Sequence, residues 1–561
     1  MNGLMQDWPL LCHRIMEHAA RQHGQRRVVS RAENGSLKVT NYSEIYSRSL
    51  RVSQSLLREG VVHGDRIATI AWSTSDHLEC WYGIAGTGAV YHPINPRLFA
   101  DQIAFIINDA KDRIVFVDAS FISLAESLQE RIPLVERFVV FTDGEKLPES
   151  GLRGAIAYEE WLAEGGVDYI WPNFEENLAA GLAYTSGTTG QPKGVLYSHR
   201  SIVLMSLAAN SPDMYGFGAS DVVLQVVPMF HANGWTWPFS APMAGAGLIL
   251  PGAQMDGASL SQLMTEEKVT CTGGVPTVWQ GVLSHLAEEG QGLTALRRLY
   301  IGGSPCPRFM MEAFKRFNVE VRSAFGMTEM GPMAAIGSHV PETASLTGEP
   351  LSEMQQKQGR APFMVEMQIY GEEDEQLPWD GSTSGRLKAR GPCVARTYYG
   401  ATHDLLDAKG FFDTGDIATI DQYGYIKITD RAKDLVKSGG EWISSIDLEN
   451  FVTDHPEIHE AAVVGVIHPK WDERPIVVAV KKAGAIVTKE ALLEFLSSRI
   501  AKWWMPDDII FVDSLPHTST GKLNKKLLRA EYERHLVDMP QARETLNFEA
   551  DIAMMEGKTN V

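Results

Sequence analysis

Residues 179–195 read AAGLAYTSGTTGQPKGV: an apolar run typical of a buried strand leads into a loop of small polar residues. Gly187, Gly190 and Gly194 let the backbone approach a ligand closely and adopt positive φ angles. The hydroxyl groups and Lys193 supply donors and a positive charge, which suit a polyphosphate. A flexible surface turn is the alternative, but this density of such residues after a strand favours phosphate binding. The candidate phosphate contacts are Thr185, Ser186, Gly187, Thr188, Thr189 and Lys193.

This loop differs from the P-loop of kinases and ATPases. The pattern GxxxxGK[ST] occurs neither in the loop nor elsewhere in the chain. The formal net charge of −19 also argues against a nucleic-acid partner. We therefore expect a different class of nucleotide-binding protein, whose partners are small molecules.

Composition points to an ordinary intracellular protein. The five cysteines are scattered and form no CxxC pair, so we expect them to be reduced. The first residues lack the features of a signal peptide, and no window approaches the ~20 apolar residues that a membrane helix needs. We expect a cytoplasmic protein without an integral membrane segment. A homodimer is one option that the sequence leaves open.

Length and pattern indicate two domains, because 561 residues exceed the size of a single hydrophobic core. Short apolar strands alternate with helical patterns from about residue 60 onward, which predicts parallel α/β layers. Shorter strands with glycine turns begin near residue 364 and predict a small β-rich subdomain. We expect an α/β fold: a large N-terminal domain of layered α/β subdomains with that β-rich subdomain (1–430), and a small mobile C-terminal α+β domain (431–561).

Five further motifs follow the phosphate loop in a recognisable order. They are VPMFHANGW (227–235), GGSPCP (302–307), FGMTE (325–329), FFDTGDIA (411–418) and PHTSTGKLNKK (516–526). Together with the loop they resemble the adenylate-forming superfamily of acyl-CoA synthetases, luciferases and peptide-synthetase adenylation domains. The chain is most similar to the bacterial medium- and long-chain fatty acyl-CoA ligases. The resemblance covers nearly the whole chain and implies ATP, Mg²⁺ and coenzyme A as the small molecules involved.

The resemblance also implies the residues of a nucleotide site. Phe325 would stack on adenine, and Asp416 would take both ribose hydroxyls, which suits a group that only accepts hydrogen bonds. Glu329 would hold the Mg²⁺ that accompanies ATP. Further nucleotide contacts would be Gly303, Ser304, Gly326, Thr328 and Arg431.

Other motif residues are implied in catalysis. Lys522 would contact the substrate carboxylate and the α-phosphate together, stabilising charge in the transition state. His231, Thr185 and Glu329 complete the implied catalytic set. Lys525, Lys526 and Arg529 follow at helical spacing, and we interpret them as a solvated helix face rather than a phosphate site.

A second, thioester-forming state is implied by two segments after residue 430. Lys433 occupies the hinge position, about which the C-terminal domain would rotate between two half-reactions. The loop that would then admit the pantetheine arm comprises Lys437, Gly439, Gly440, Glu441 and Trp442.

The acyl pocket is the place where the sequence departs from its family. Medium- and long-chain ligases commonly read HVNAW where this chain reads HANGW, so Ala232 and Gly234 are smaller than usual. Local volume can set chain preference, since each buried methylene is worth ~0.8 kcal/mol. The implied pocket residues are His231, Trp235, Trp237, Gly326 and Met327.

The sequence thus predicts an ATP-dependent acyl-CoA ligase. It would convert a carboxylic acid, ATP and coenzyme A into acyl-CoA, AMP and diphosphate through an acyl-adenylate. The acid would be a medium-chain or a bulky, branched or aryl-substituted alkanoic acid. An adenylation domain for amino acids is disfavoured, because FHANGW contains no aspartate to bind the amino group. Two alternative functions remain: a luciferase, and a nucleotide-binding scaffold without catalytic activity.

Overall fold

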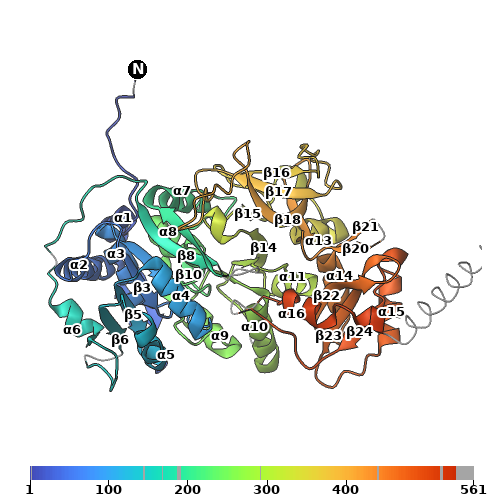
Figure 1. The fold of residues 1–561 in the computed structure, drawn as a ribbon, viewed down its shortest axis with the longest axis horizontal. Coiled ribbons are helices and arrows are strands. Elements are labelled where there is room, and N and C mark those ends of the chain that lie inside the picture. The colour runs from blue at the N-terminus through green and yellow to red at the C-terminus, as the bar shows by residue number, and fades with distance from the viewer. Residues whose placement is uncertain are drawn as a thin grey trace, which may run out of the picture.

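The computed structural model describes residues 1, 3–142, 146–166, 168–185, 191–290, 292–438, 441–518 and 522–538, without the side chains of Asn233, Glu441 and Trp442. Within these residues the chain forms four β-sheets with helices packed on their faces (Figure 1). Two large sheets build the blue-to-green part of Figure 1, and two smaller sheets lie in its yellow and red parts.

The first large sheet has seven strands in the order β7–β6–β5–β3–β4–β8–β9. Neighbours are parallel except for the hairpin β8–β9, and helices make the crossovers that parallel strands require. The strands are β3 Arg66–Ile70, β4 Val90–Pro93, β5 Ile114–Asp118, β6 Arg137–Phe141, β7 Ala155–Ala157, β8 Ala179–Thr185 and β9 Lys193–Ser198. The helices are α2 Tyr42–Arg58, α3 Ser75–Gly86, α4 Ala100–Ala110, α5 Ile122–Leu128 and α6 Tyr158–Ala163, with the short turns η1 Ala119–Phe121 and η2 Gln129–Arg131.

The second large sheet has eight strands in the order β15–β14–β13–β12–β10–β11–β1–β2. Its inner strands are parallel and buried on both faces, and antiparallel partners close both edges. The strands are β1 Arg27–Arg31, β2 Leu37–Asn41, β10 Val222–Leu224, β11 Gly247–Leu250, β12 Cys271–Gly274, β13 Arg298–Gly302, β14 Glu320–Phe325 and β15 Ala335–Ile336. The helices are α1 His13–His23, α7 His199–Ala209, α8 Trp237–Ala244, α9 Gly257–Glu266, α10 Pro276–Glu289 and α11 Arg308–Lys315, with the short turns η3 Ala232–Thr236 and η4 Thr328–Met330.

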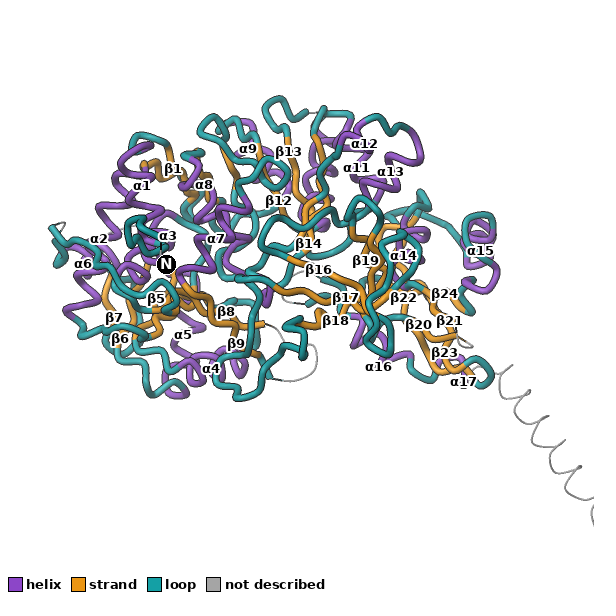
Figure 2. The backbone as a smooth tube through the Cα atoms, turned by 90° about the horizontal axis from the view of Figure 1, so that it is seen from above, coloured by secondary structure: helices purple, strands orange, loops and turns teal. Residues whose placement is uncertain are grey.

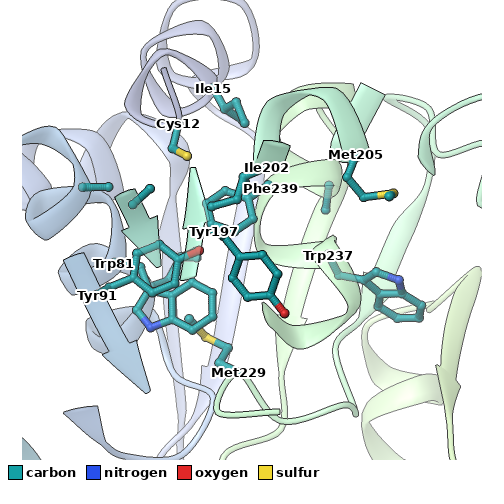
Figure 3. Close-up of a cluster of buried hydrophobic side chains, with 14 of the residues drawn as sticks. Cys12, Ile15, Trp81, Tyr91, Tyr197, Ile202, Met205, Met229, Trp237 and Phe239 are labelled. Carbon is teal, nitrogen blue, oxygen red and sulfur yellow. The ribbon is translucent and has the colours of Figure 1, made fainter. Parts of the chain in front are cut away.

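One apolar core joins the two large sheets. Trp81 of α3 stacks on Tyr91 of β4 with ring centroids 4.4 Å apart, and Phe239 of α8 packs beside both rings (Figure 3). Figure 3 also shows Cys12, before α1, in this cluster. Since the same cluster includes strand residues of both sheets, such as Ile67 of β3 and Leu248 of β11, the two layers share one core.

The two smaller sheets follow in the second half of the chain. An antiparallel sheet contains β16 Glu366–Tyr370, β17 Gly385–Arg390, β18 Phe412–Ile420 and β19 Ile426–Arg431. Before it come the helices α12 Pro341–Ala344 and α13 Gly348–Gln356. The last sheet contains β20 Val436–Ser438, β21 Glu441–Ile443, β22 Ile458–His468, β23 Asp472–Lys481 and β24 Asp508–Phe511. Its helices are α14 Ser445–Thr453, α15 Lys489–Ser497, α16 Lys525–Tyr532 and α17 His535–Asp538, with the short turn η5 Lys502–Trp504.

This architecture confirms the predicted fold class of layered α/β subdomains, a small β-rich subdomain and a small C-terminal α+β unit. Figure 2 shows that the C-terminal unit, β20–β24 with α14–α17, lies at one end of the molecule beside β16–β19. The chain passes from one small sheet to the other between Arg431 and Val436. The predicted boundary after residue 430 falls at the end of β19, directly before this passage, and remains a prediction.

Two further expectations concern the sequence as a whole. Among the described residues, no helix combines the length and the apolar character needed to cross a membrane. All five cysteines are buried and unpaired, which agrees with the expected reduced state.

A pair of buried histidines links α1 to α7. The backbone N–H of Cys12 donates to Nδ1 of His199, and the His13 ring lies 6.4 Å from the His199 ring. Within the part of the chain that the structure describes, Nδ1 of His13 and Nε2 of His199 are buried without a hydrogen-bond partner. Burial lowers the pKa of both imidazoles to about 3, with smaller contributions from neighbouring positive groups. Both side chains are therefore neutral in the folded protein at any pH above about 3.

We predict that His13→Phe makes stability less sensitive to acid. In the unfolded chain a histidine titrates near pH 6.5, so the unfolded state gains a proton below that pH while folded His13 does not. The free energy of unfolding therefore decreases as the pH is lowered. Between pH 7.5 and 5.5 the wild type should lose about 1.4 kcal/mol of unfolding free energy through this residue, a loss that the variant avoids. Urea denaturation at both pH values measures the difference. His403→Phe, at an exposed position, is the control and should leave the loss unchanged.

Candidate active site

The root of the predicted phosphate loop is the hairpin β8–β9, which pairs Thr185 with Lys193. Ser198, the last residue of β9, accepts a hydrogen bond from Ser201 N and so caps α7, which fixes the path of the chain away from the hairpin. The predicted contacts Ser186, Gly187, Thr188 and Thr189 lie outside the described residues. The hairpin thus brings one hydroxyl and one positive charge together at the base of the loop.

One tyrosine that belongs to no motif connects the hairpin with the predicted metal ligand. The ring centre of Tyr398 lies 4.9 Å from Nζ of Lys193, a cation–π contact. Its hydroxyl donates to Oε1 of Glu329 over 2.8 Å. The backbone is tied as well, since Tyr399 N donates to Gly194 O over 2.8 Å. The segment around Tyr398 therefore connects the phosphate loop at Lys193 with the motif that contains Glu329.

Glu329 itself sits in η4 and is 6% exposed. Tyr197 donates from its hydroxyl to the carbonyl of Thr328 over 2.6 Å, which anchors the turn on β9. A Cβ at Gly326 would lie 1.9 Å from Pro332 O, so this position after Phe325 accepts only glycine. Phe325, Gly326 and Thr328 are half-buried here, next to Glu329.

The donor set around Glu329 fits Mg²⁺ carried by a nucleotide. No cluster of three or more His, Cys, Asp or Glu side chains in the described part of the chain could hold a metal without other ligands. Mg²⁺ commonly takes one or two protein carboxylates and completes its shell with phosphate oxygens and water. A single carboxylate near the root of a phosphate loop matches that requirement.

Asp416 and Arg431 form the predicted ribose site. They are direct neighbours in the register of β18 and β19, and Arg431 Nε lies 2.8 Å from Asp416 Oδ1. Asp416 is 2% exposed, and its Oδ2 is buried and has no hydrogen-bond partner among the described residues. Burial raises the pKa of Asp416 to about 6, although Arg431 acts to lower it. A buried acceptor without a donor fits the hydroxyls of a ribose.

Lys522 reaches this site from the C-terminal unit. Its backbone N–H donates to Thr518 Oγ1 and its carbonyl accepts from Thr518 N, so two hydrogen bonds tie Lys522 to Thr518. A Cβ at Gly303 would lie 3.5 Å from Lys522 Cε, which places the side chain on the predicted adenine loop. Burial, followed by the charge of Arg431, lowers the pKa of Lys522, while Asp416 and Glu329 act in the opposite direction.

His231 completes the group of converging side chains. Burial and then the charge of Lys522 lower the pKa of this imidazole to about 4, so it is neutral near pH 7. A neutral imidazole can hydrogen-bond a carboxylate without adding charge. The structure therefore collects Lys522, His231, Asp416, Arg431 and Glu329, which come from motifs far apart in the sequence, into one electrostatically coupled site.

The two tryptophans of the predicted acyl pocket have different surroundings. Trp235 points at the end of β13, where a Cβ at Gly302 would lie 3.0 Å from its Cη2. Trp237 is fully buried and packs edge-on against Tyr215 and Phe217, inside the aromatic core (Figure 3). Met327 is half-buried beside the same core. The pocket role of Trp235, Trp237 and Met327 stays a prediction.

The residues after Lys522 correct one expectation. Only Lys526 has the exposed position expected of a solvated face. Lys525 instead forms a buried ion pair with Glu449 Oε1 at 2.6 Å and donates to Ser445 Oγ at 2.6 Å. Arg529 pairs with Asp434, next to the predicted hinge. Helical spacing alone did not reveal which side of α16 packs against α14.

The predicted hinge and thioester loop occupy consecutive turns. Asp434 N and Leu435 N both donate to Arg431 O, so Lys433 lies exposed in a tight turn between β19 and β20. In the hairpin β20–β21, Lys437 pairs with Trp442. Gly439 and Gly440 lie outside the described residues, as do the side chains of Glu441 and Trp442.

Comparison with known proteins places this geometry in a family. A model described as AMP-binding enzyme matches residues 16–399, and one described as AMP-binding enzyme C-terminal domain matches residues 447–522. The 3-methylmercaptopropionyl-CoA ligase of Ruegeria lacuscaerulensis is 44% identical over 534 residues, covering 95% of this chain and 99% of that protein. The medium-chain-fatty-acid–CoA ligase of Ectopseudomonas oleovorans is 43% identical, with coverages of 95% and 98%.

Solved structures agree on the fold. The crystal structure of the anthranilate CoA ligase AuaEII in complex with anthranoyl-AMP superposes with a TM-score of 0.83 at 21% identity, covering 94% of this chain and 99% of that one. The chain therefore belongs to the AMP-binding enzyme family, within which it is an AMP-forming acid–thiol ligase that uses ATP, Mg²⁺ and coenzyme A.

Proposed function

We propose that this ligase activates medium-chain or bulky, branched or aryl-substituted alkanoic acids, with the catalytic roles divided between the N-terminal residues and Lys522. The observation that carries the assignment of roles is the position of Lys522 over Gly303, coupled electrostatically to His231, Asp416 and Glu329. In this arrangement the site has the groups needed for the first half-reaction.

In that half-reaction the carboxylate of the acid attacks the α-phosphate of ATP and displaces diphosphate. Asp416 and Arg431 hold the ribose, and Thr185 with Lys193 binds the outgoing phosphates. Lys522 neutralises charge that builds on the α-phosphate, a role in which positioning and electrostatics supply nearly all of the catalysis. Glu329 would hold Mg²⁺, which neutralises phosphate charge when bound. Neutral His231 orients the attacking carboxylate.

The second half-reaction needs a different arrangement. The thiol of coenzyme A attacks the acyl-adenylate carbonyl, the bond to AMP breaks, and AMP leaves. We propose that the C-terminal domain, residues 431–561, turns about Lys433, withdraws Lys522 and presents the loop of residues 437–442. Because both steps would use the same site, Lys522 must be able to leave it, which explains its location on the C-terminal domain.

A buried network holds the unit in the first orientation. Asp430 Oδ2, just before the proposed hinge, accepts from Ser445 N and Ser445 Oγ, each over 2.6 Å. Lys525 donates to the same Ser445 oxygen and pairs with Glu449. Asp430 is 1% exposed and Ser445 fully buried. Rotation about Lys433 must break the bonds between Asp430 and Ser445, because the two residues stand on opposite sides of the hinge.

The chemistry of the acid is inferred from the turn of residues 231–235 and from the relatives. One relative is named for 3-methylmercaptopropionyl-CoA and another for medium-chain fatty acids, which are acids of moderate length. Ala232 provides space near His231, and Trp235 limits the depth next to Gly302. A medium-length or laterally bulky chain fits these two features. The cytoplasm as its location, suggested by the unpaired cysteines, is part of the same proposal.

We predict that Lys522→Ala separates the two half-reactions. Removing a preorganised positive group should slow acyl-adenylate formation about 10²–10³-fold, while supplied acyl-adenylate and coenzyme A are still converted. Diphosphate release and thioester formation are measured in parallel. Lys526→Ala, four residues on and exposed, is the control and should change neither rate. An equal fall in both rates would contradict the division of roles.

A second prediction concerns the network at the hinge. Asp430→Asn keeps the side-chain size but removes the charge that binds Ser445 and faces Lys525. Acyl-adenylate formation should fall on the order of tenfold, the value of one charged hydrogen bond, while conversion of supplied acyl-adenylate stays the same or rises. The exposed Asp513→Asn is the matched control. Loss of the second half-reaction alone would show that the network serves the other orientation.

The acid itself is tested with a panel. Straight acids from acetate to C16, 2-methyl acids and aryl-substituted acids are each supplied with ATP, with and without coenzyme A. With coenzyme A we expect acid-dependent release of AMP and diphosphate in equal amounts, with the highest kcat/KM for a medium-length or laterally substituted acid; without it we expect diphosphate release without matching AMP release. A clear preference for acetate or for C16 acids would refute the proposed substrate class.

A further inference from the structure

A buried amide supports the turn that carries His231 and Trp235. Gln225 directly follows β10 and is fully buried. Its backbone N–H donates to Ile249 O over 2.9 Å, which fixes it to the neighbouring strand β11. Its side-chain Nε2 donates to Val227 O over 2.6 Å and to Gly234 O over 3.0 Å. One side chain thus joins the end of a core strand to a turn nine residues later.

The fit between Gln225 and Gly234 leaves no room for a side chain. A Cβ at Gly234 would lie 2.7 Å from Gln225 Nε2, closer than Cβ atoms approach other heavy atoms in proteins. The same Cβ would lie 3.3 Å from the ring of Pro238. Gly234 also has a φ of +53°, which favours glycine. The space that a missing side chain leaves at this position is therefore filled by the amide of Gln225.

This contact changes the interpretation of the motif HANGW. From the sequence we expected the small residues Ala232 and Gly234 to make room for a bulkier acid. For Gly234 this expectation is wrong, because the amide of Gln225, and not a substrate, fills the space that a side chain at position 234 would occupy. Ala232, with a φ of +42°, remains as the small residue whose space is not taken by this amide.

The turn that Gln225 supports has a backbone that L-amino acids rarely adopt. The φ angles of Gly234, Trp235 and Thr236 are +53°, +56° and +68°. Three consecutive left-handed residues are unfavourable and persist only where the surroundings over-determine them. Here Gln225 holds Gly234 O, and the Tyr215 hydroxyl donates to Trp235 O over 3.1 Å.

The direction of this backbone decides where two functional side chains point. Gly234 N donates to His231 O over 2.9 Å, so the amide of Gln225 and the histidine are linked through one residue. The left-handed conformation of Trp235 aims its indole at Gly302, at the edge of the predicted adenine loop. A relaxed backbone would move the indole away from Gly302 and change the depth of the pocket.

We propose that Gln225 is a positioning residue for acid selection: through Gly234 it holds the left-handed turn that sets the indole of Trp235 and hence the length of acid the site accepts. The proposal rests on the acyl pocket described under the proposed function. Gln225 does not contact the acid in this account and acts through the turn.

The hydrogen bonding of Gln225 separates this role from a merely structural one. Its Oε1 is buried and has no hydrogen-bond partner among the described residues, which carries a desolvation penalty. Methionine has a similar length and removes that penalty together with the two bonds from Nε2; Gly234 O keeps the bond from Trp237 N, whereas Val227 O loses the donor that Gln225 supplies. Gln225→Met should therefore lower stability only moderately, whereas the position of the turn should change.

The first experiment measures acid selection in Gln225→Met. We expect the ratio of kcat/KM between long and short straight-chain acids to shift on the order of tenfold from that of the wild type, with the KM for ATP unchanged and the variant still folded at the assay temperature. An unchanged chain-length profile would overturn the proposal. An equal loss of activity for all acids would also overturn it, because it would indicate a structural role only.

The second experiment is a double-mutant cycle. Gly234→Ala should lower the melting temperature and the activity, because the new methyl group collides with the amide of Gln225. Adding Gln225→Ala removes the amide, and the double variant should recover much of the loss, although each single change is harmful. If the double variant is as impaired as the sum of the two single variants, the steric coupling is absent and the proposal fails.

A matched control accounts for the positive φ angle. Gly290 has a φ of +63°, and a Cβ there would meet nothing within 4 Å. Gly290→Ala therefore reports the backbone strain alone, and Gly234→Ala should be clearly worse. The thermal readout of the cycle does not depend on the substrate, so failure of the proposed function, seen as absence of acid-dependent AMP release by the wild type, is distinguishable from failure of this inference.

Discussion

The contacts that place one half-buried lysine, Lys522, involve several distant parts of this structure. A lysine loses hydration when it is buried, and here Arg431 adds a second positive charge to its surroundings. Asp416 and Glu329 supply the compensating negative charge, and both carboxylates are themselves nearly inaccessible. Such a cluster is stable only if every member is held in place, because removing one leaves an unpaired buried charge. Three features meet that requirement: the register of β18 and β19 holds Asp416 and Arg431, η4 holds Glu329, and the C-terminal unit holds Lys522.

Holding the cluster requires contacts that connect distant parts of the chain. Tyr398 is the clearest example, since its ring faces Lys193 while its hydroxyl binds Glu329. The pair Lys525–Glu449 and the bonds between Asp430 and Ser445 do the same for the C-terminal unit. These bonds lie beside the turn of Lys433. The side chains that hold the C-terminal unit, and with it Lys522, are therefore next to the residue about which the proposed rotation would take place.

The sequence predicted those parts of the site whose geometry is local. Thr185 and Lys193 flank one short loop, and Asp416 and Arg431 lie on neighbouring strands of one hairpin, so a motif and a strand pattern were enough. Tyr398 was missed because a single tyrosine in a polar segment gives no signal. Its neighbours in space, Lys193 and Glu329, are far away in sequence. Lys525 was misread because helical spacing defines a face but not what packs against it.

Gly234 is a second case in which the sequence does not reveal the spatial neighbours of a motif residue. A small residue in a binding motif suggests room for substrate, yet the room can equally serve a buried neighbour. Only the three-dimensional structure identifies Gln225, nine residues earlier and directly after β10, as the group that uses it. Interpretation of pocket volume from a motif alone therefore needs the identity of the residues behind the motif.

Two features of the site, one carboxylate oxygen and one lysine, connect the fold with its substrates. Asp416 Oδ2 is buried and has no donor among the described residues, and burial lowers the pKa of Lys522. A nucleotide would supply both missing elements, ribose hydroxyls for the carboxylate and phosphate charge for the lysine. Its binding would thus stabilise the orientation in which the C-terminal unit presents Lys522. Departure of diphosphate would remove part of that negative charge. In the proposed rotation about Lys433, this loss of charge would favour withdrawal of the lysine, so the charges that assemble the site for adenylation would also favour leaving it.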